Sequence, residues 1–543
     1  MSILSHLKAN WKSGITVSLV SIPLSVSLAV ASQTTPLAGI ITAIWAGLMA
    51  SIFGGSNFNI VGPTGALSGL LATYAISQGA GALPSLALVS GLFILIAYLL
   101  KLEKYLVFVP ANTIHGFTLG VAFIISLNQL NSALGITGLK AHERLIENLK
   151  ESFENLNRID PFTVIVFLIF LTLLIFWPKI NKSIPGAIVL APIGIVLGYL
   201  STIQKLPFTL QTLGMRFTNI NPEFYSSWEF KFSPQLITTA IVVAFVAILE
   251  TMISAKIADG MTKTKHDKRK EMLGLGIANL ASGIMGGIPA TAALARTSLN
   301  IKSGATNKIS ATISSISILL ISFVFLAYFK FIPMAVIAAI LVNVAIRMIE
   351  TEHFNKMYKH DKKSFILSML VAFITVYEDP TVGILFGVAI SLIIFVEKLS
   401  KGQYELIVND INKKIADQVE GEGAHTHNLK ANADTLVYSF KGQLAYVNGQ
   451  AHISRFERGF SKEYKNIILR FRGVYFIDLD GIEVLEEILT HLKAEDKQIL
   501  ISGVSPVIEP LLETSKIYME MKKHKQIFNK TSEALKALGY SHL

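Results

Sequence analysis

The hydrophobic positions of this chain gather into long blocks that short polar connections separate. Between about Gly14 and Glu397 most blocks run for roughly 17–25 residues, the length of an α-helix that crosses a bilayer. Fourteen such segments can be placed, and two of them, after Gly62 and after Ile288, are short or interrupted. The segments are 14–32, 37–54, 62–78, 84–100, 112–131, 161–177, 184–201, 234–258, 270–286, 289–301, 306–329, 332–349, 364–378 and 380–397. The pattern predicts an α-helical polytopic membrane domain over residues 1–400.

Lysine and arginine concentrate in alternate connections between these segments. The basic connections lie at 101–104, 179–182, 263–270, 302–308, 347–363 and 398–401, whereas 132–160 and 202–233 mix acids with bases. Connections rich in basic residues stay on the cytoplasmic side of a membrane. We therefore expect both termini in the cytoplasm and the chain in the cell membrane, as a multi-pass protein with a retained N-terminus.

Composition narrows the class further. The chain has 52% hydrophobic and 16% charged residues, and its mean hydropathy is +0.53, whereas soluble domains carry about 25% charged residues. The net charge of +11 is explained by the basic residues of the connections expected in the cytoplasm, so no nucleic-acid partner is expected. Because the chain has no cysteine, a disulfide framework and a thiolate metal site are excluded. No catalytic triad, nucleotide motif, cofactor site or metal site stands out, and we expect no enzyme.

The two halves of the membrane domain carry related motifs. Ile22-Pro23-Leu24-Ser25 and Ile248-Leu249-Glu250-Thr251 are 226 residues apart, and so are Gly62-Pro63-Thr64-Gly65-Ala66 and Ile288-Pro289-Ala290-Thr291-Ala292. Seven crossings in each half is an odd number, so the second copy must be inverted. An inverted repeat of seven plus seven segments is the plan of secondary transporters.

The second motif of each half predicts an anion site. Near Asn59–Gly65 and Gly286–Thr291 we expect an extended stretch, then a helix that begins at or just after the proline. A helix N-terminus offers free N–H groups and about half a positive charge. Two such termini facing each other near the midplane would bind an anion largely through backbone. The alternative is a pair of proline kinks with packing glycines.

Ionisable residues inside membrane segments usually have a function. Glu250 lies in the middle of segment 234–258, with Ser254 on the same helix face, and Arg296 lies in the second short helix. The alternative for Glu250 and Arg296 is a structural ion pair. Asp259 and Glu271 are expected at the interface. His115, which opens the fifth segment, is expected to pack or to lie at the interface rather than to bind a ligand.

These residues resemble a SulP anion permease, the family of bacterial sulfate, bicarbonate and dicarboxylate transporters and their animal relatives. The passages that carry the resemblance are Gly62-Pro63-Thr64-Gly65, Glu250–Gly260, Glu271–Asn279 and Gly286–Thr297. The resemblance implies a core domain and a gate domain, with the anion between the third and tenth helices, against the first and eighth. Transport would then move the core against the gate as an elevator, and we expect a homodimer.

Residues carried over by position define the expected site. Substrate contacts would come from Leu24, Ser25, Thr64, Gly65, Ala66, Ala292, Ala293, Leu294 and Arg296, and ion coupling from Glu250 and Ser254. Sodium-coupled bicarbonate members carry aspartate, threonine and threonine where this chain has Glu250, Ser254 and Leu294. The incomplete oxygen set favours proton symport or anion exchange over sodium coupling.

The C-terminal region has the pattern of a small α/β domain. Residues 401–432 are expected to be a linker and 433–543 the domain, with strands at 435–440, 466–471 and 498–502 and a helix at 480–493. This order resembles a STAS domain, whose signature loop Asp-Ser-Ser-Gly is here Asp478-Leu479-Asp480-Gly481. Without the serines, phosphorylation of this loop cannot switch the protein. Asp480 would hold a fixed charge there or cap the helix that follows.

Three functions therefore remain open from the sequence. The leading one is secondary active transport of a small anion, with sulfate, bicarbonate and C4-dicarboxylates all open. A nucleobase permease of the same fold is the second. The third is an anion-sensing membrane protein that signals through its soluble domain.

Overall fold

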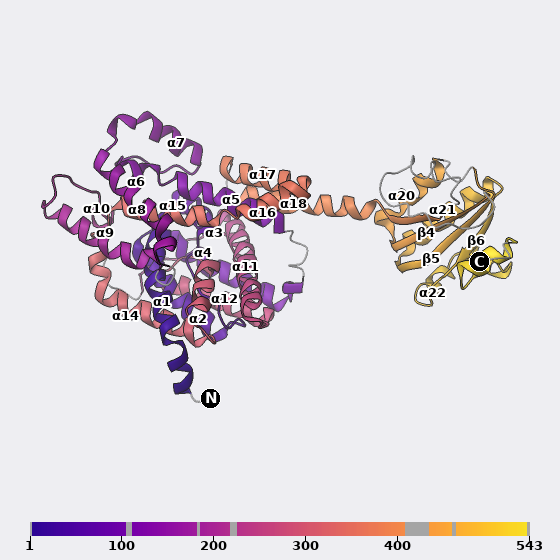
Figure 1. Ribbon diagram of the computed structural model, residues 1–543, viewed down its shortest axis with the longest axis horizontal. Helices are drawn as coiled ribbons and strands as arrows, with labels where there is room; N and C mark the ends of the chain where they lie inside the picture. Colours follow the sequence, from indigo (N-terminus) through magenta and orange to yellow (C-terminus); the bar gives the residue numbers. More distant parts are fainter. Residues whose placement is uncertain are drawn as a thin grey trace. The chain divides into compact units, whose positions relative to one another are not determined.

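A computed structural model describes residues 3–104, 111–181, 185–217, 225–378, 380–407, 434–458 and 463–539. The chain divides into two compact units, residues 1–391 and 392–543, which are described separately below. Helices make up almost all of the first unit, and a five-stranded sheet lies at the centre of the second (Figure 1). The acidic turn after Glu378 includes Asp379, which lies outside the described residues.

Two helices of the first half of this unit, α2 and α8, begin where the sequence supplies a capping residue. Thr35 precedes Pro36 and accepts from the amide of Ala38, and Asp160 precedes Pro161 in the same way. The helices are α1 (Ile3–Ala31), α2 (Pro36–Phe53), α3 (Gly65–Gln78), α4 (Leu83–Leu99), α5 (Ala111–Leu127), α6 (Leu130–Leu134), α7 (Leu145–Glu154), α8 (Pro161–Ile180), α9 (Gly186–Thr202) and α10 (Leu213–Arg216).

The second half follows the same rule where its first two helices begin. Ser233 caps α11 before Pro234, and Asp267 caps α12. The helices are α11 (Pro234–Thr262), α12 (Lys268–Ile284), α13 (Leu294–Lys302), α14 (Ile309–Phe329), α15 (Met334–Met348), α16 (Thr351–His360), α17 (Lys362–Tyr377) and α18 (Pro380–Ser400).

Many helices of the membrane domain are long enough to cross a bilayer. Among the described residues, nine helical stretches are long and apolar enough to cross a bilayer. The helices α3, with 14 residues, and α13, with 9, are too short to cross alone, as the interrupted segments predicted. The architecture of a helical membrane core is confirmed, while the number of fourteen crossings stays a prediction.

A two-stranded ribbon joins the two halves inside this unit. Strand β1 (Val61–Gly62) pairs antiparallel with β2 (Thr291–Ala292), so that Val61 faces Ala292 and Gly62 faces Thr291. A buried cluster surrounds the ribbon and is contributed by α2, α4, α11 and α12. Non-helical backbone is tolerated at membrane depth only when it is enclosed by protein in this way.

The register of the second motif differs from the prediction. Helix α3 begins two residues after Pro63, as expected, but α13 begins at Leu294, five residues after Pro289. The capping positions Thr64 and Ala293 are therefore 229 residues apart rather than 226. Residues 291–293 are extended because they pair with residues 60–62 of the other half of the unit, which a local motif cannot reveal.

The second unit is an α/β domain. Its sheet has the order β3 (Gln403–Ile407), β4 (Thr435–Leu444), β5 (Asn466–Ile477), β6 (Gln498–Ser502) and β7 (Ile527–Phe528), parallel except for β3. The predicted strands and helix are found, and β3 lies within the range expected to be linker. The helices are α20 (Tyr446–Glu457), α21 (Leu479–Ala494), α22 (Glu509–Leu512), α23 (Lys516–Lys523) and α24 (Thr531–Ala537).

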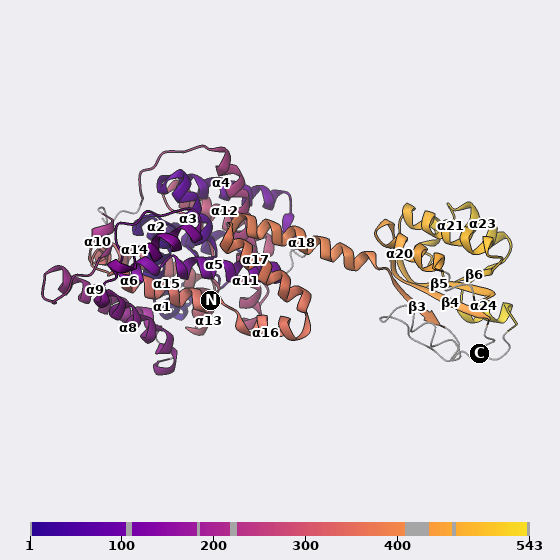
Figure 2. The ribbon, with the colours of Figure 1, turned by 90° about the horizontal axis from the view of Figure 1, so that it is seen from above.

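Helices cover both faces of this sheet. A large cluster packs α20, α21, α22 and α23 on one face, and a smaller one packs α24 on the other (Figure 2). Strand residues buried on both faces form continuous apolar runs, such as Ile467-Ile468-Leu469, which is typical of a parallel sheet.

Candidate functional site

The N-termini of α3 and α13 form the centre of the candidate site. Thr64 and Ala293 cap these helices in extended conformation, and β1 and β2 hold the two helix starts side by side. The amides in the first turn of a helix have no acceptor within the helix. The amide of Ala293 already donates to the carbonyl of Ile60 at 2.9 Å. In α13 the free amides therefore begin at Leu294.

Arg296 supplies a full positive charge at these termini. Its side chain is buried, at 3% exposure, and its Nη2 donates to the carbonyl oxygen of Pro63 at 2.5 Å. The Nη1 atom is also buried and has no hydrogen-bond partner among the described residues. A Cβ atom at Gly62 would lie 3.0 Å from Nη1, so a larger residue there would crowd the guanidinium. An unpaired guanidinium nitrogen beside two helix N-termini is suited to an anion.

Glu250 lies at the edge of the same site on α11. Its Oε2 accepts from the hydroxyl of Thr64 at 3.1 Å, and the residue is only partly buried. The ion pairs among the described residues do not include Glu250 with Arg296, because Arg296 bonds instead to Pro63. The two side chains therefore make no direct hydrogen-bonded pair, although their charges interact.

The remaining predicted contact residues fall into two groups. Gly65, Ala66 and Ala292 are buried, whereas Leu24, Ala293 and Leu294 are partly exposed. The hydroxyl of Ser25 on α1 is buried and has no hydrogen-bond partner among the described residues. A buried polar atom without a partner is costly, so Ser25 has hydrogen-bonding capacity left for a ligand or water.

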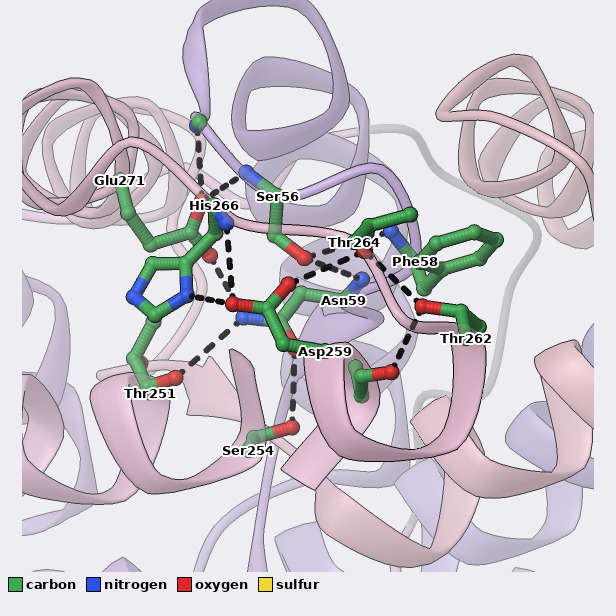
Figure 3. A network of polar contacts seen from close by, with 12 residues as sticks. Ser56, Phe58, Asn59, Thr251, Ser254, Asp259, Thr262, Thr264, His266 and Glu271 are labelled. Atoms are coloured by element: carbon green, nitrogen blue, oxygen red, sulfur yellow. Dashed lines mark hydrogen bonds and ion pairs between the residues drawn. The ribbon is translucent and has the colours of Figure 1, made fainter. Parts of the chain in front are cut away.

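Ser254 belongs to a different network. Its hydroxyl donates to Asn59 Oδ1 at 2.9 Å (Figure 3). It also contacts Thr297 Oγ1 at 3.1 Å, and none of the hydrogen bonds among the described residues joins it to Glu250. The side chain is fully buried. The structure therefore places Ser254 behind the turn that leads into β1, where it positions Asn59, rather than beside the carboxylate of Glu250.

Glu271 is the main residue whose place was predicted wrongly. It was expected at the interface, yet it is only 4% exposed. Its Oε2 accepts from the amides of Gly55 and Ser56 at 2.8 and 2.7 Å, and its Oε1 accepts from Asn59 at 2.6 Å (Figure 3). The carboxylate thus fixes the turn that leads into β1.

The turn that leads into β2 is fixed by neutral side chains instead. Thr42 accepts from the amide of Ile288 at 2.7 Å. Asn279 bonds both the amide and the carbonyl of Ala290, at 2.8 and 3.0 Å. One half therefore uses a carboxylate and the other an amide and a hydroxyl to hold equivalent turns. The roles of Glu271, Thr42 and Asn279 could not be predicted from local sequence, because the backbone groups that they bind are remote in the chain or belong to another element.

Asp259 closes this polar region at the end of α11. Its carboxylate accepts from the backbone amide of His266 at 2.9 Å and lies 2.7 Å from His266 Nδ1 (Figure 3). Thr264 donates to its other oxygen at 3.1 Å. Asp259 therefore shapes the turn from α11 to α12, and among the described residues no contact with Arg296 or Glu250 connects it to the candidate anion site.

A polar cavity of about 290 Å³ lies between α3, α5 and the connections expected outside the membrane. Gly69 and Thr73 of α3 and Ile124 of α5 line it. The other lining residues, Asn128, Lys140, His142, Arg216 and Glu378, lie in or beside the connections between helices. Gly69 is one helical turn from Gly65. The cavity therefore approaches the N-terminus of α3.

The signature loop of the second unit has a structural role that was predicted for the wrong aspartate. Asp478, not Asp480, caps α21, and its Oδ1 accepts from the amide of Gly481 at 2.7 Å. Leu479 beside it is 68% exposed. Asp480 is left free of the capping role.

Fold and site together define a helical membrane protein with an anion-suited site between two short helices, followed by an α/β domain. The chain matches the profile of the sulfate permease family over residues 7–371 and that of the STAS domain over residues 426–534. It belongs to the sulfate permease family and carries a C-terminal STAS domain. Members of this family are anion transporters rather than enzymes.

Relatives cover nearly the whole chain. YvdB of Bacillus subtilis, whose name marks it as a candidate sulfate transporter, is 30% identical over 516 residues, or 94% of each chain. The bicarbonate transporter BicA of Picosynechococcus is 25% identical over 98% of this chain and 95% of its own. Murine solute carrier 26 family member A9 has the same fold at 14% identity, with a TM-score of 0.84 over 99% of this chain and 93% of its own.

Proposed function

We propose that this protein is a secondary active transporter that carries sulfate, bicarbonate or a C4-dicarboxylate. The anion binds at the N-termini of α3 and α13, between the two halves of the first unit. The observation that carries the proposal is Arg296, whose Nη1 is buried without a partner among the described residues, beside those termini. The names of the relatives YvdB and BicA support sulfate and bicarbonate as the first candidates.

The groups that would contact the anion are mostly backbone. The first-turn amides of α3 at Gly65 and Ala66 and those of α13 from Leu294 onward point their partial charges at the site. Ser25 adds a hydroxyl with spare hydrogen-bonding capacity. Leu24, Thr64, Ala292 and Ala293 would form the walls, because they lie on α1 or at the starts of α3 and α13.

Coupling would depend on Glu250. Two helix termini contribute about one positive charge, Arg296 adds one, and an ionised Glu250 subtracts one. A proton on Glu250 therefore increases the attraction for an anion. Sodium is disfavoured because Leu294 replaces an oxygen ligand of the sodium-coupled members, and because the hydroxyl of Ser254 points to Asn59 and Thr297 rather than to Glu250. We infer proton–anion symport, with anion exchange as the alternative if Glu250 stays ionised.

Transport would proceed by movement of a core around the site against a gate. Helices α1, α2, α4, α11, α12, α13 and α14 pack mainly on one another, while α5, α8, α15 and α17 form a second group. The protein would act as a homodimer in the cell membrane. The distribution of basic connections supports both termini and the STAS domain in the cytoplasm.

Flux through the purified protein in sealed liposomes tests this function. Sulfate, bicarbonate, succinate and uracil should be offered separately. Each should be tested with an inwardly directed proton gradient (acidic outside), an inwardly directed sodium gradient or no gradient. We expect uptake of at least one anion, stimulated by external acidity, and its loss in Arg296→Gln. Uptake of uracil alone would support the nucleobase permease. A folded protein that moves none of the four would support the sensor.

A further inference from the structure

Three side chains that could share one metal ion meet at the N-terminal end of α5, which is predicted to face the cytoplasm. His115 of α5 places its Nδ1 3.0 Å from Oε2 of Glu350, the residue that precedes α16. His353, in the first turn of α16, stacks on His115 with ring centroids 3.8 Å apart. One ligand atom from each of the three lies within 4.8 Å of the others. His115 is therefore not the lone histidine that its sequence context suggested.

The cluster has unused donor capacity. The Nε2 atom of His353 is buried and has no hydrogen-bond partner among the described residues. The side chains of His115 and Glu350 are 20% and 47% exposed, so an ion can reach them from solvent. An ion pair between His115 and Glu350 alone would not require the imidazole of His353 to stack on that of His115. It would also not explain why Nε2 of His353 is buried without a partner.

The distances suit a small tetrahedral ion. Zn²⁺ binds imidazole nitrogen and carboxylate oxygen at about 2.0–2.2 Å, so two ligands on one tetrahedral ion lie about 3.3 Å apart. The observed 3.0 Å between His115 and Glu350 fits this edge, and one ligand atom of His353 lies within 4.8 Å of both. Two imidazoles exclude Mg²⁺ and Ca²⁺, which prefer all-oxygen sites.

We propose that His115, Glu350 and His353 form a binding site for a late first-row divalent cation such as Zn²⁺, with a water in the fourth position. No metal was expected from the sequence, so this proposal departs from that prediction. It does not depend on the proposed transport function, because it rests on side chains outside the anion site.

The position of the cluster gives the ion a structural effect. Met348, two residues before Glu350, ends α15, and a Cβ atom at Gly65 would lie 2.7 Å from its sulfur. The bound ion would hold Glu350 to α5 and so restrain Met348 against the N-terminus of α3. A cation on the cytoplasmic side would thus act on a contact between the predicted gate and core.

Zinc titration of the full-length protein tests the site. The protein should be purified without a histidine tag, stripped with EDTA and titrated with Zn²⁺ by calorimetry in detergent. The chain has 12 histidines, so variants are needed to distinguish binding at the proposed site from weak unspecific binding elsewhere. We expect one tight Zn²⁺ per chain, weakened about 100-fold or more in His353→Ala, since even groups that only orient a ligand contribute up to about 100-fold.

A matched control is available in His142→Ala. His142 also contacts a carboxylate, with its Nε2 2.9 Å from Glu151 Oε2, but no second imidazole joins that pair among the described residues. Its removal should leave the tight site unchanged. Equal affinity in wild type, His353→Ala and His142→Ala would overturn the proposal.

Cobalt substitution keeps the proposal testable if His353→Ala does not fold. Co²⁺ in a tetrahedral site of two nitrogens and a carboxylate absorbs strongly in the visible range, and the wild-type protein can be measured without any variant. We expect such bands at one Co²⁺ per chain and their displacement by Zn²⁺. A weak octahedral spectrum alone would contradict the tetrahedral site.

Discussion

The substitution Leu294→Pro tests whether backbone amides bind the anion. Leu294 is the first residue of α13 and is partly exposed. Proline fits this position without disturbing a helix. Ala293 before it has φ −93° and ψ 110°, a conformation that a residue before proline readily adopts. The variant therefore removes one free N–H from the site and should leave α13 in place.

The expected loss follows from the type of hydrogen bond. A hydrogen bond to a charged group contributes about 1.5–3 kcal/mol, and each 1.4 kcal/mol is tenfold in affinity. We therefore expect Leu294→Pro to weaken anion binding by about 10- to 150-fold. Ala293→Pro would not test the same idea, since that amide donates to Ile60 and its loss would disturb the ribbon.

The assay is equilibrium binding of the radiolabelled anion that the flux panel identifies, on purified protein by scintillation proximity. Leu294→Ala is the matched control, because it removes the same side chain but keeps the N–H. If both variants melt at the wild-type temperature and bind within twofold of each other, the amide of Leu294 does not contact the anion and the proposed cradle is wrong.

Three further predictions concern other parts of the chain. Glu250→Gln should abolish uptake driven by a pH gradient but keep anion exchange in liposomes; unimpaired driven uptake would exclude Glu250 as proton carrier. Glu271→Gln places an NH2 donor against either the amides of Gly55 and Ser56 or the Nδ2 of Asn59, which should cost about 1–3 kcal/mol, seen as a lower melting temperature. Burial, and then nearby Arg455, lowers the pKa of His452 to about 3. Because the folded pKa lies below the unfolded one, stability is lost as pH falls below about 6.5. Hydrogen exchange of STAS peptides should report about 2 kcal/mol less protection at pH 5 than at pH 7, and His452→Gln should remove this dependence.

Periodicity predicted the helices and the STAS sheet because both depend on local patterns. Long apolar runs identified α1, α2, α4 and α11, and strands of continuous apolar residues identified β4, β5 and β6. The buried charges Glu250 and Arg296 could also be found, since an ionisable residue within an apolar segment is conspicuous.

The details of the site depend on partners far apart in the sequence. The start of α13 was placed near Pro289 because proline suits the first turn of a helix, yet Asn279 and residues 60–62 bond residues 290–293 and hold them extended. Glu271 looked interfacial because its partners Gly55, Ser56 and Asn59 are more than 200 residues away. His115 looked isolated for the same reason, with Glu350 and His353 outside any local pattern.

The hydrogen bonds of the site indicate which contacts can change during transport. Arg296 joins α13 to Pro63, Thr64 joins α3 to Glu250 of α11, and the ribbon joins both halves. The anion site should therefore move as one body. By contrast, Gly65 faces α15 and α5 through the side chains of Met348 and Ile125, which are apolar contacts without hydrogen bonds. Packed apolar surfaces can slide by small steps without losing polar partners. If transport follows the proposed elevator mechanism, alternating access would be a slide of α3 past α5 and α15. Glu350, two residues from Met348, lies where a bound cation would oppose that slide.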